Sequence, residues 1–256
     1  MKRNTDYKNA ALAALKGNWG KAVLATVIFL AIVYLALGPY VYQTVKVQNY
    51  VQESLPQMSS SVGLGSAMRQ AMEATLSMSQ DPEYISMQSK AQGSMGLYYL
   101  LLFFVVMPLS VGFINALRKL LVEGDNAVAG NMYNIATKNY WHKVWGMFLM
   151  YLFIVLWSLL LIIPGIIKAF SYSMTQFILE ENPELSANEA IDHSRAMMKG
   201  HKFDLFWLLL SFIGWGILCI FTFGIGYIWL TPYVNTSVAA FYEDVKADYE
   251  ANGGLI

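Results

Sequence analysis

A stretch of 38 residues without a charged side chain, Leu205 to Tyr242, constrains the fold of this chain most strongly. As one helix, at about 1.5 Å per residue, it would be about 57 Å long. The hydrocarbon core of a bilayer is about 30 Å thick and takes about 20 helical residues. The stretch therefore predicts two membrane-spanning helices, separated by a break at Gly224 and Gly226.

A second long apolar stretch, Val144 to Leu179, contains a single charged residue, Lys168. The Pro164-Gly165 pair divides it and predicts a tight hairpin of two short helices. Both a full crossing and a re-entrant course of the membrane fit residues 144–180. Two further apolar runs lie nearer the N-terminus, and Pro39 is expected to kink or end the first of them. The predicted spans are residues 22–43, 97–117, 144–163, 165–180, 205–222 and 225–242.

The composition agrees with a membrane protein, since 56% of the residues are hydrophobic and 13% are charged, against about 25% charged residues in soluble chains. The net charge is zero, which provides no basic face for nucleic acid. The one cysteine, Cys219, rules out an internal disulfide and a cysteine cluster for a metal. The predicted fold class is thus an all-α integral membrane protein.

The distribution of lysine and arginine predicts the orientation. With the N-terminus inside, the predicted inner segments hold all of the 17 lysines and arginines except Lys46, Arg69, Lys90 and Lys168. Positively charged loops remain on the cytoplasmic side. We therefore expect a multi-pass protein of the bacterial cytoplasmic membrane with both termini in the cytoplasm. The basic N-terminal segment is interpreted as a cytoplasmic helix before an uncleaved first span.

Residues 46–96 form a predicted extracytoplasmic insert rich in methionine, glutamine and serine. Two of its pieces, VQNYVQESLPQ and SAMRQAMEATLSM, have helical character, so we expect partial order. Its methionines, among them Met58, Met68 and Met72, raise the possibility of a Cu(I) site. No histidine or cysteine accompanies them, and packing is the better interpretation.

The chain also shows a threefold repeat. Asn139-Tyr-Trp-His and Gly200-His-Lys-Phe are equivalent junctions 61 residues apart, and Gly17-Asn-Trp-Gly-Lys is a third. Each module is predicted to contain an amphipathic cytoplasmic helix, a basic-aromatic junction, a span, a break, a second span and an acidic end. The six spans would then form three hairpins. The acidic ends are Glu123, Glu180-Glu181 and Glu243-Asp244.

The amphipathic helices carry local sequence signals. In 126–138, Val128, Met132 and Ile135 share one face, and Asp125 is a predicted N-cap. In 186–199, Ser186 and Glu189 form a capping box. The apolar face of this last helix predicts either an interfacial position, in the acyl boundary, or docking on the cytoplasmic ends of the spans.

A polar residue occurs about two turns before the acidic end of each module, namely Asn115, Ser173 and Asn235. These groups predict either interhelical hydrogen bonds or a polar cavity on a pseudo-threefold axis. A polar stripe at spacing four completes the candidate cavity set: Lys168, Tyr172, Gln176 and Glu180. Lys168 either extends to the outer interface or lines a proton or substrate path with Glu180.

The junctions and the third amphipathic helix supply a candidate cytoplasmic interface of aromatic and basic residues. Its members are Trp19, Trp141, Arg195, Lys199, His201 and Lys202. The chain contains no phosphate-binding loop, nucleophile elbow or dinucleotide fingerprint. We therefore assign no catalytic residue, metal ligand or cofactor.

Several segments resemble an uncharacterised family of bacterial integral membrane proteins, "domain of unknown function 975". The resemblance is carried by residues 15–19, 168–174, 194–201, 210–215, 224–226, 229–233 and 241–242. It covers nearly the whole chain except the insert and implies no activity or catalytic residue. The layout of hairpins and amphipathic helices is also similar to the membrane portion of some glycerophosphodiester phosphodiesterases, at the level of architecture only.

The leading functional hypothesis is a non-enzymatic membrane protein that associates with lipid or envelope components or binds a protein partner. The alternative is a transporter or permease for a small or amphiphilic molecule, with its path among the hairpins. A membrane enzyme acting on lipid-linked substrates is the third possibility. The expected partners are the lipid bilayer and a protein partner or a second copy, but not nucleic acid.

Overall fold

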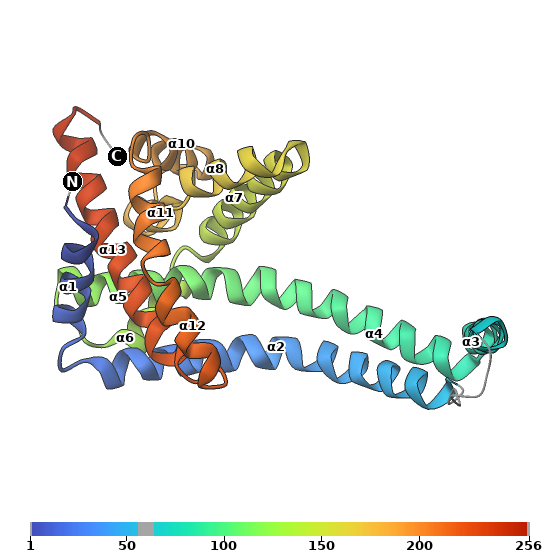
Figure 1. Cartoon of the computed structure of the whole chain (residues 1–256). Coiled ribbons are helices and arrows are strands. Elements are labelled where there is room, and N and C mark those ends of the chain that lie inside the picture. Colours follow the sequence, from blue (N-terminus) through green and yellow to red (C-terminus); the bar gives the residue numbers. More distant parts are fainter. Residues whose placement is uncertain (1, 56–63, 255–256) are drawn as a thin grey trace. The chain divides into compact units, whose positions relative to one another are not determined.

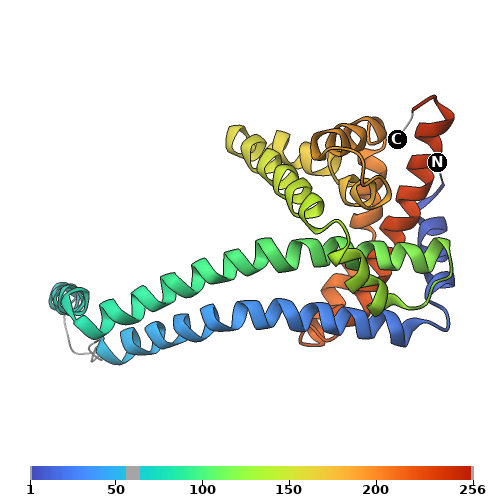
Figure 2. The same ribbon diagram turned by 180° about the vertical axis from the view of Figure 1, so that it is seen from behind.

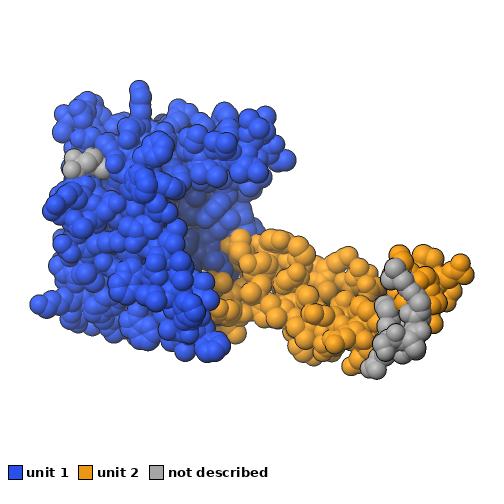
Figure 3. All heavy atoms as spheres, in the orientation of Figure 1, with its two compact units in different colours: residues 1–31, 103–256 blue, residues 32–102 orange. Residues whose placement is uncertain are grey.

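A computed structural model describes residues 2–55 and 64–254, and all regular elements in these ranges are helices. The chain divides into two units, residues 1–31 with 103–256 and residues 32–102, which Figure 3 distinguishes by colour. The helices of the first half are α1 (Asn4–Leu15), α2 (Trp19–Ser54), α3 (Leu64–Gln80), α4 (Pro82–Leu101), a π-helical turn (Leu102–Val106), α5 (Met107–Val122) and α6 (Val128–Thr137). The second half contains α7 (Tyr140–Leu160), α8 (Ile162–Ser171), α9 (Thr175–Glu181), α10 (Ala187–Met197), α11 (Lys202–Leu210), α12 (Ile213–Phe221) and α13 (Tyr227–Ala251).

The unit of residues 32–102 is built from the second part of α2 together with α3 and α4. Tyrosine rings stack between α2 and α4, with centroids 6.4 Å apart for Tyr40–Tyr98 and 6.1 Å apart for Tyr50–Tyr84. Asp81 caps α4 by accepting a hydrogen bond from the Glu83 backbone N–H at 2.7 Å. Both pieces of the insert with predicted helical character fall largely in helices. Residues 56–63, including Met58, lie outside the described residues.

The expectation that Pro39 could end the first span is wrong, because α2 continues as a helix to Ser54 with Pro39 inside it. A proline removes one backbone hydrogen bond, and a helix with enough apolar packing on either side tolerates that loss. The described part of the insert is therefore mostly helical, in the end of α2, in α3 and in the first part of α4.

In the larger unit, the three helices predicted to be amphipathic, α1, α6 and α10, dock on neighbouring helices. Helix α1 lies beside α13 and α6 lies beside α5 (Figures 1 and 2), while α10 contacts α7 and α9. The predicted stripe of α6 is confirmed, since Val128, Met132 and Ile135 are all buried. At Gly112, α5 approaches α6 so closely that a Cβ atom would lie 2.2 Å from the Met132 carbonyl oxygen.

Docking on protein replaces the interfacial position considered for α10. The side chains of its apolar face, from Ala187 to Met197, are buried among the neighbouring helices, so this face is not available to acyl chains. The capping box is confirmed, because Glu189 N–H donates to Ser186 Oγ at 3.3 Å and Ser186 N–H donates to Glu189 Oε2 at 2.7 Å. Asp125 does not occupy the N-cap position, which is Ala127, but it accepts a hydrogen bond from the Ala127 N–H at 3.0 Å.

Five stretches in the described residues are long and apolar enough to cross a membrane: Trp19–Ser54, Pro82–Val122, Tyr140–Leu160, Ile162–Glu181 and Lys202–Phe221. Helix α13, which contains all but the first two residues of the predicted sixth span 225–242, is not among them. Its second half is polar and charged, which lowers its mean hydropathy. The structure thus supports a helical protein with five candidate spans, and the sixth span and the three-hairpin arrangement stay predictions.

Two turns expose large apolar side chains. Between α7 and α8, Leu159 is 78% exposed and Ile162 is 75% exposed, and after α12, Phe223 is 98% exposed. Soluble proteins rarely expose contiguous apolar surface of this kind. The turn after α12 lies at the break expected around Gly224. The break expected at Pro164-Gly165 is wrong in position, because the chain turns at Leu161 and both residues lie inside α8. A proline is tolerated in the first turn of a helix, since the N–H groups there have no partner within the helix. Both turns are suited to a hydrocarbon environment.

Candidate functional site

Helices α7, α8 and α10 line an open pocket of about 500 Å³ within the larger unit. Its wall combines three aromatic rings, two basic groups, one carboxylate and one amide. The lining residues are Phe153, Trp157, Lys168, Tyr172, Asn188, Ile191, Asp192 and Arg195. Three of them, Lys168, Tyr172 and Arg195, belong to the candidate residues predicted from the sequence.

Close packing of α8 on α7 positions Lys168. A Cβ atom at Gly165 would lie 2.2 Å from Ser158 Oγ, so glycine allows the two helices to approach here. The Lys168 ammonium then lies 4.5 Å from the centroid of the Trp157 ring and 5.9 Å from that of Tyr172. Both are cation–π distances. No carboxylate of the described residues forms a salt bridge with Lys168.

Helix α10 is fixed by a buried hydrogen-bonded serine. Ser194 Oγ donates to the Ser171 carbonyl at 2.9 Å and accepts from the Met174 N–H at 3.2 Å. Because buried polar groups need such partners, these bonds tie α10 to the end of α8. The opposite face of α10 presents Asn188, Asp192 and Arg195, spaced one and two turns apart, to the pocket.

The electrostatics of the pocket favour an anion. Arg195 pairs with Asp192 at 3.0 Å, as expected from their spacing, but their side chains are 55% and 62% exposed. Exposed pairs of this kind contribute about 0–1 kcal/mol, so the guanidinium can exchange its partner easily. Together with Lys168, the pocket has two positive groups and one negative group. It contains no cysteine, serine or histidine that could act as a nucleophile or base.

The polar stripe predicted on one straight helix is interrupted. The chain turns at residues 172–174, so Lys168 lies on α8 whereas Gln176 and Glu180 lie on α9. Lys168 and Arg195 were assigned to different locations from the sequence, yet they line one pocket. Glu180 is instead paired with Lys143, with 2.7 Å between Oε2 and Nζ.

Lys143 is the most deeply buried charged side chain of this region, with 1% exposure. Its ammonium also donates to the carbonyl oxygens of Lys138, at 2.6 Å, and of Ile135. These carbonyls lie at the C-terminal end of α6, where a cation is favoured by the helix dipole. Lys143 therefore joins α6, α7 and α9 rather than facing the cytoplasm as a free basic residue.

The three equivalent polar residues have individual backbone partners. Asn115 Nδ2 donates to the Val111 and Gln176 carbonyl oxygens, both at 3.0 Å. Ser173 Oγ donates to Phe170 and Asn235 Nδ2 donates to Thr231, each at 2.8 Å. None of the three lines the pocket at Lys168. Asn115 Oδ1 is buried without a hydrogen-bond partner.

An ion-pair centre on Arg118 was missed from the sequence. Its guanidinium contacts the carboxylates of Glu181 and Glu243 and lies 5.4 Å from the centroid of the Tyr242 ring. Glu181 also accepts from Tyr242 and, at 2.9 Å, from Lys246. Glu181 and Glu243, at the predicted acidic ends of the second and third modules, thus both contact Arg118, which belongs to the first predicted module. The matching positions of these two carboxylates in their modules could have indicated that they meet.

The remaining interface residues have different surroundings. Trp141 is 71% exposed and Lys199 is exposed. His201 lies 3.2 Å from Asp248. Lys202 lines an apolar groove beside α8, and Trp19 lines a cavity near α12. In the described residues, no group of three or more histidine, cysteine, aspartate or glutamate side chains could hold a metal ion.

Among the carboxyls outside the candidate spans, Asp244 and Glu189 have lowered pKa values. Burial raises the pKa of Asp244, but hydrogen bonds from Tyr7 at 2.7 Å and from the Lys2 N–H at 3.0 Å outweigh it and lower the pKa overall. The hydrogen bonds of the capping box with Ser186 lower the pKa of Glu189. Both groups stabilise helix docking or helix ends rather than contributing to the pocket.

Comparison with known proteins gives a family but no activity. A family model described as "Protein of unknown function (DUF975)" matches residues 1–249. No curated protein and no solved structure matches the chain. Nothing in these comparisons connects it with glycerophosphodiester phosphodiesterases.

Proposed function

Because the chain belongs to the DUF975 family of unknown function, we propose a function from its polar pocket: binding the anionic headgroup of a membrane amphiphile. The observation that supports this most is the pairing of Lys168 with Arg195 on one pocket of about 500 Å³. Two basic groups with one carboxylate leave one positive charge for an anion. This proposal makes the lipid-associated role favoured by the sequence specific to one pocket.

The surroundings of the pocket favour an amphiphile over a free anion. Trp157 lies on the pocket wall, and the exposed apolar residues Leu159, Leu160 and Ile162 follow within the next turn and a half. Tryptophan is typical of the boundary between headgroups and acyl chains. A ligand with its charge at Lys168 could therefore lay its hydrocarbon part along the apolar turn between α7 and α8.

This proposal includes a location in a bacterial cytoplasmic membrane with both termini inside, as the lysine and arginine distribution predicts. Reporter fusions at the two ends test it, and a periplasmic signal from either end would refute that orientation. The same fusions placed after α12 test whether α13 provides a sixth crossing.

Lipid binding is tested with the purified chain in nanodiscs of zwitterionic phospholipid, into which an anionic phospholipid is titrated. Native mass spectrometry counts the anionic lipids that remain bound. The double variant K168Q/R195Q is expected to weaken their retention at least tenfold. K199Q is the matched control, because Lys199 is exposed, precedes α11 and does not line the pocket.

Equal retention by the double variant and by K199Q would refute the headgroup site. If inorganic phosphate displaced the anionic phospholipid with an affinity similar to that of the lipid, the pocket would be a site for free anions, and the hydrocarbon part of the lipid would not contribute to binding. Circular dichroism and size-exclusion elution of each variant separate loss of binding from loss of folding.

A transporter is the second candidate, and one specific observation favours it. Asn115 Oδ1 is a buried acceptor without a hydrogen-bond partner, as expected where a solute or water passes. Asn115→Leu would abolish solute flux in proteoliposomes if the residue lines a path. Unchanged flux in this variant, with folding preserved, would remove the path at Asn115.

A further inference from the structure

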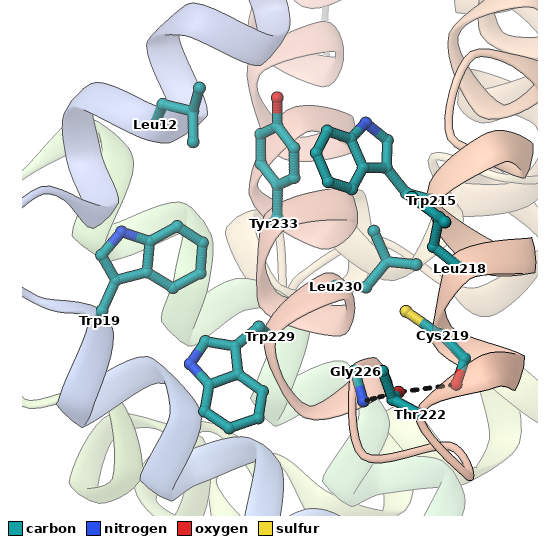
Figure 4. Close-up of a pocket in the computed structure, with 10 residues that line it drawn as sticks. All are labelled: Leu12, Trp19, Trp215, Leu218, Cys219, Thr222, Gly226, Trp229, Leu230 and Tyr233. Carbon is teal, nitrogen blue, oxygen red and sulfur yellow. Dashed lines mark hydrogen bonds between the residues drawn. The ribbon is translucent and has the colours of Figure 1, made fainter.

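A second cavity, of about 480 Å³, lies in the larger unit beside the junction of α1 and α2. Figure 4 shows that Trp19, Trp215 and Trp229 surround it, with Tyr233 above and Cys219 and Thr222 near its floor. It contains no charged side chain. Its volume falls within the roughly 300–1,000 Å³ typical of small-molecule sites.

The floor of the cavity offers only apolar contact. Thr222 Oγ1 donates to the Cys219 carbonyl at 2.8 Å and accepts from the Gly226 N–H at 2.9 Å. The Thr222 hydroxyl thus already has a donor and an acceptor partner within the turn. A ligand that reaches this floor gains no new polar partner from Thr222, so a hydrocarbon group is favoured there.

The opposite end of the cavity is close to a positive charge. The Tyr233 hydroxyl points away from the Thr222–Gly226 floor (Figure 4). The Tyr233 ring lies 5.1 Å from the ring of Phe212, and the Lys8 ammonium lies 4.2 Å from the centroid of Phe212. The cavity therefore has an apolar floor and, beyond Tyr233, a cation that can attract a negative headgroup.

We propose that this cavity binds one acyl chain of a membrane phospholipid, with the phosphate at the Tyr233 end near Lys8. Its walls include the start of Trp19–Ser54 and the end of Lys202–Phe221, both candidate spans. Hydrocarbon is the surrounding medium for such segments. This site involves none of the residues at Lys168 and does not rest on the function proposed above.

The chain carries its own reporter for this site, because Cys219 is its only cysteine and lines the cavity. N-ethylmaleimide alkylation, followed by intact mass, is compared between phospholipid nanodiscs and delipidated protein in amphipol. A bound chain should slow alkylation of Cys219 at least tenfold in the nanodiscs. Equal rates in the two preparations would overturn the proposal.

A matched pair of tryptophan variants tests the location of the chain. Trp215 and Trp207 are each 56% exposed and lie on the same candidate span, but only Trp215 lines the cavity. Trp215→Ala should restore fast alkylation in nanodiscs, whereas Trp207→Ala should leave it slow. Equal rates for the two variants would refute an acyl chain in the cavity. Trp229→Phe provides a milder change of the same wall if Trp215→Ala does not fold.

The headgroup is tested by adding defined lipids to the delipidated protein. A phospholipid should protect Cys219 at lower concentration than a diacylglycerol with the same chains, and Lys8→Gln should remove this difference. Protection by both lipids at the same concentration, before and after the Lys8 change, would show that no phosphate is recognised. Protection by a free fatty acid alone would also overturn the phospholipid assignment.

Discussion

Replacing Arg118 by alanine is expected to destabilise the larger unit more than any single change of an exposed charge. Arg118 is the only cation that contacts both Glu181 and Glu243 among the described residues, and its side chain is 13% exposed. The substitution leaves two carboxylates without their shared partner at the junction of α5, α9 and α13. Removing one member of a buried ion pair commonly costs about 3–5 kcal/mol because the other charge stays buried.

The loss of stability caused by Arg118→Ala should be smaller than that range. Glu243 is 32% exposed and can be hydrated, while Glu181 keeps Lys246 at 2.9 Å. We therefore expect a loss of about 2–3 kcal/mol in the free energy of unfolding. The triple variant R118M/E181Q/E243Q should recover much of this loss, because it removes the charges together.

The assay is unfolding in mixed micelles with increasing sodium dodecyl sulfate, followed by tryptophan fluorescence. Lys119→Ala is the control, since Lys119 is the next residue on α5 and forms no salt bridge with a described residue. A loss for Arg118→Ala of less than about 0.5 kcal/mol, or no larger than that of the control, would refute the reasoning. So would a triple variant less stable than the single one.

Three further predictions use the same unfolding assay or a simple variant of it. Lys143→Met should cost about 3–5 kcal/mol, because it leaves the partly buried carboxylate of Glu180 and the carbonyls at the end of α6 without their donor; a loss below about 1 kcal/mol would contradict this. Gly112→Ala should cost about 1–3 kcal/mol, since its Cβ would lie 2.2 Å from a backbone oxygen of α6, whereas Gly130→Ala, with no atom within 4 Å of its Cβ, should not destabilise. The lowered pKa of Asp244 implies that its stabilisation is present above its unfolded-state pKa of about 4 and is lost as pH falls through the lower folded-state value. Proteolysis of α1 should accelerate over that acidic window, and Asp244→Asn should already show fast proteolysis at pH 7.

The helices were predictable from the sequence where one local signal was sufficient. The capping box of Ser186 and the apolar stripe of Val128, Met132 and Ile135 appear as expected, because each depends on residues three or four apart. The break around Gly224 was also predictable from local residues, whereas the break expected at Pro164-Gly165 occurs at Leu161, just before the helix that contains both residues. The surroundings of each helix were not predictable from the sequence. Periodicity shows that α10 has an apolar face, but it does not show whether protein or lipid covers that face.

Individual residues of the site could be predicted from the sequence, but which of them lie together could not. Lys168 and Tyr172 were identified from their spacing, and Arg195 from the charge of α10. The turn at residues 172–174 decides which of them meet, and it carries no proline or glycine. Trp157 and Asn188 were missed as site residues, although Asn188 shares the polar face of α10 with Asp192 and Arg195 at helical spacing.

The predicted repeat relates three sets of positions, but the tertiary contacts at these positions differ. Asn115 donates across the helix interface to the Gln176 carbonyl, whereas Asn235 bonds to its own helix. Glu181 and Glu243 converge on Arg118, whereas Glu123 ends α5 as its C-cap. Arg118 bridges the two carboxylates, with Nε donating to Glu243 and Nη2 donating to Glu181, and a third carboxylate would add an unpaired charge to the same partly buried site. The asymmetry therefore follows from charge balance, and it directs the search for function away from a symmetric axis and toward the two pockets beside α10 and α12.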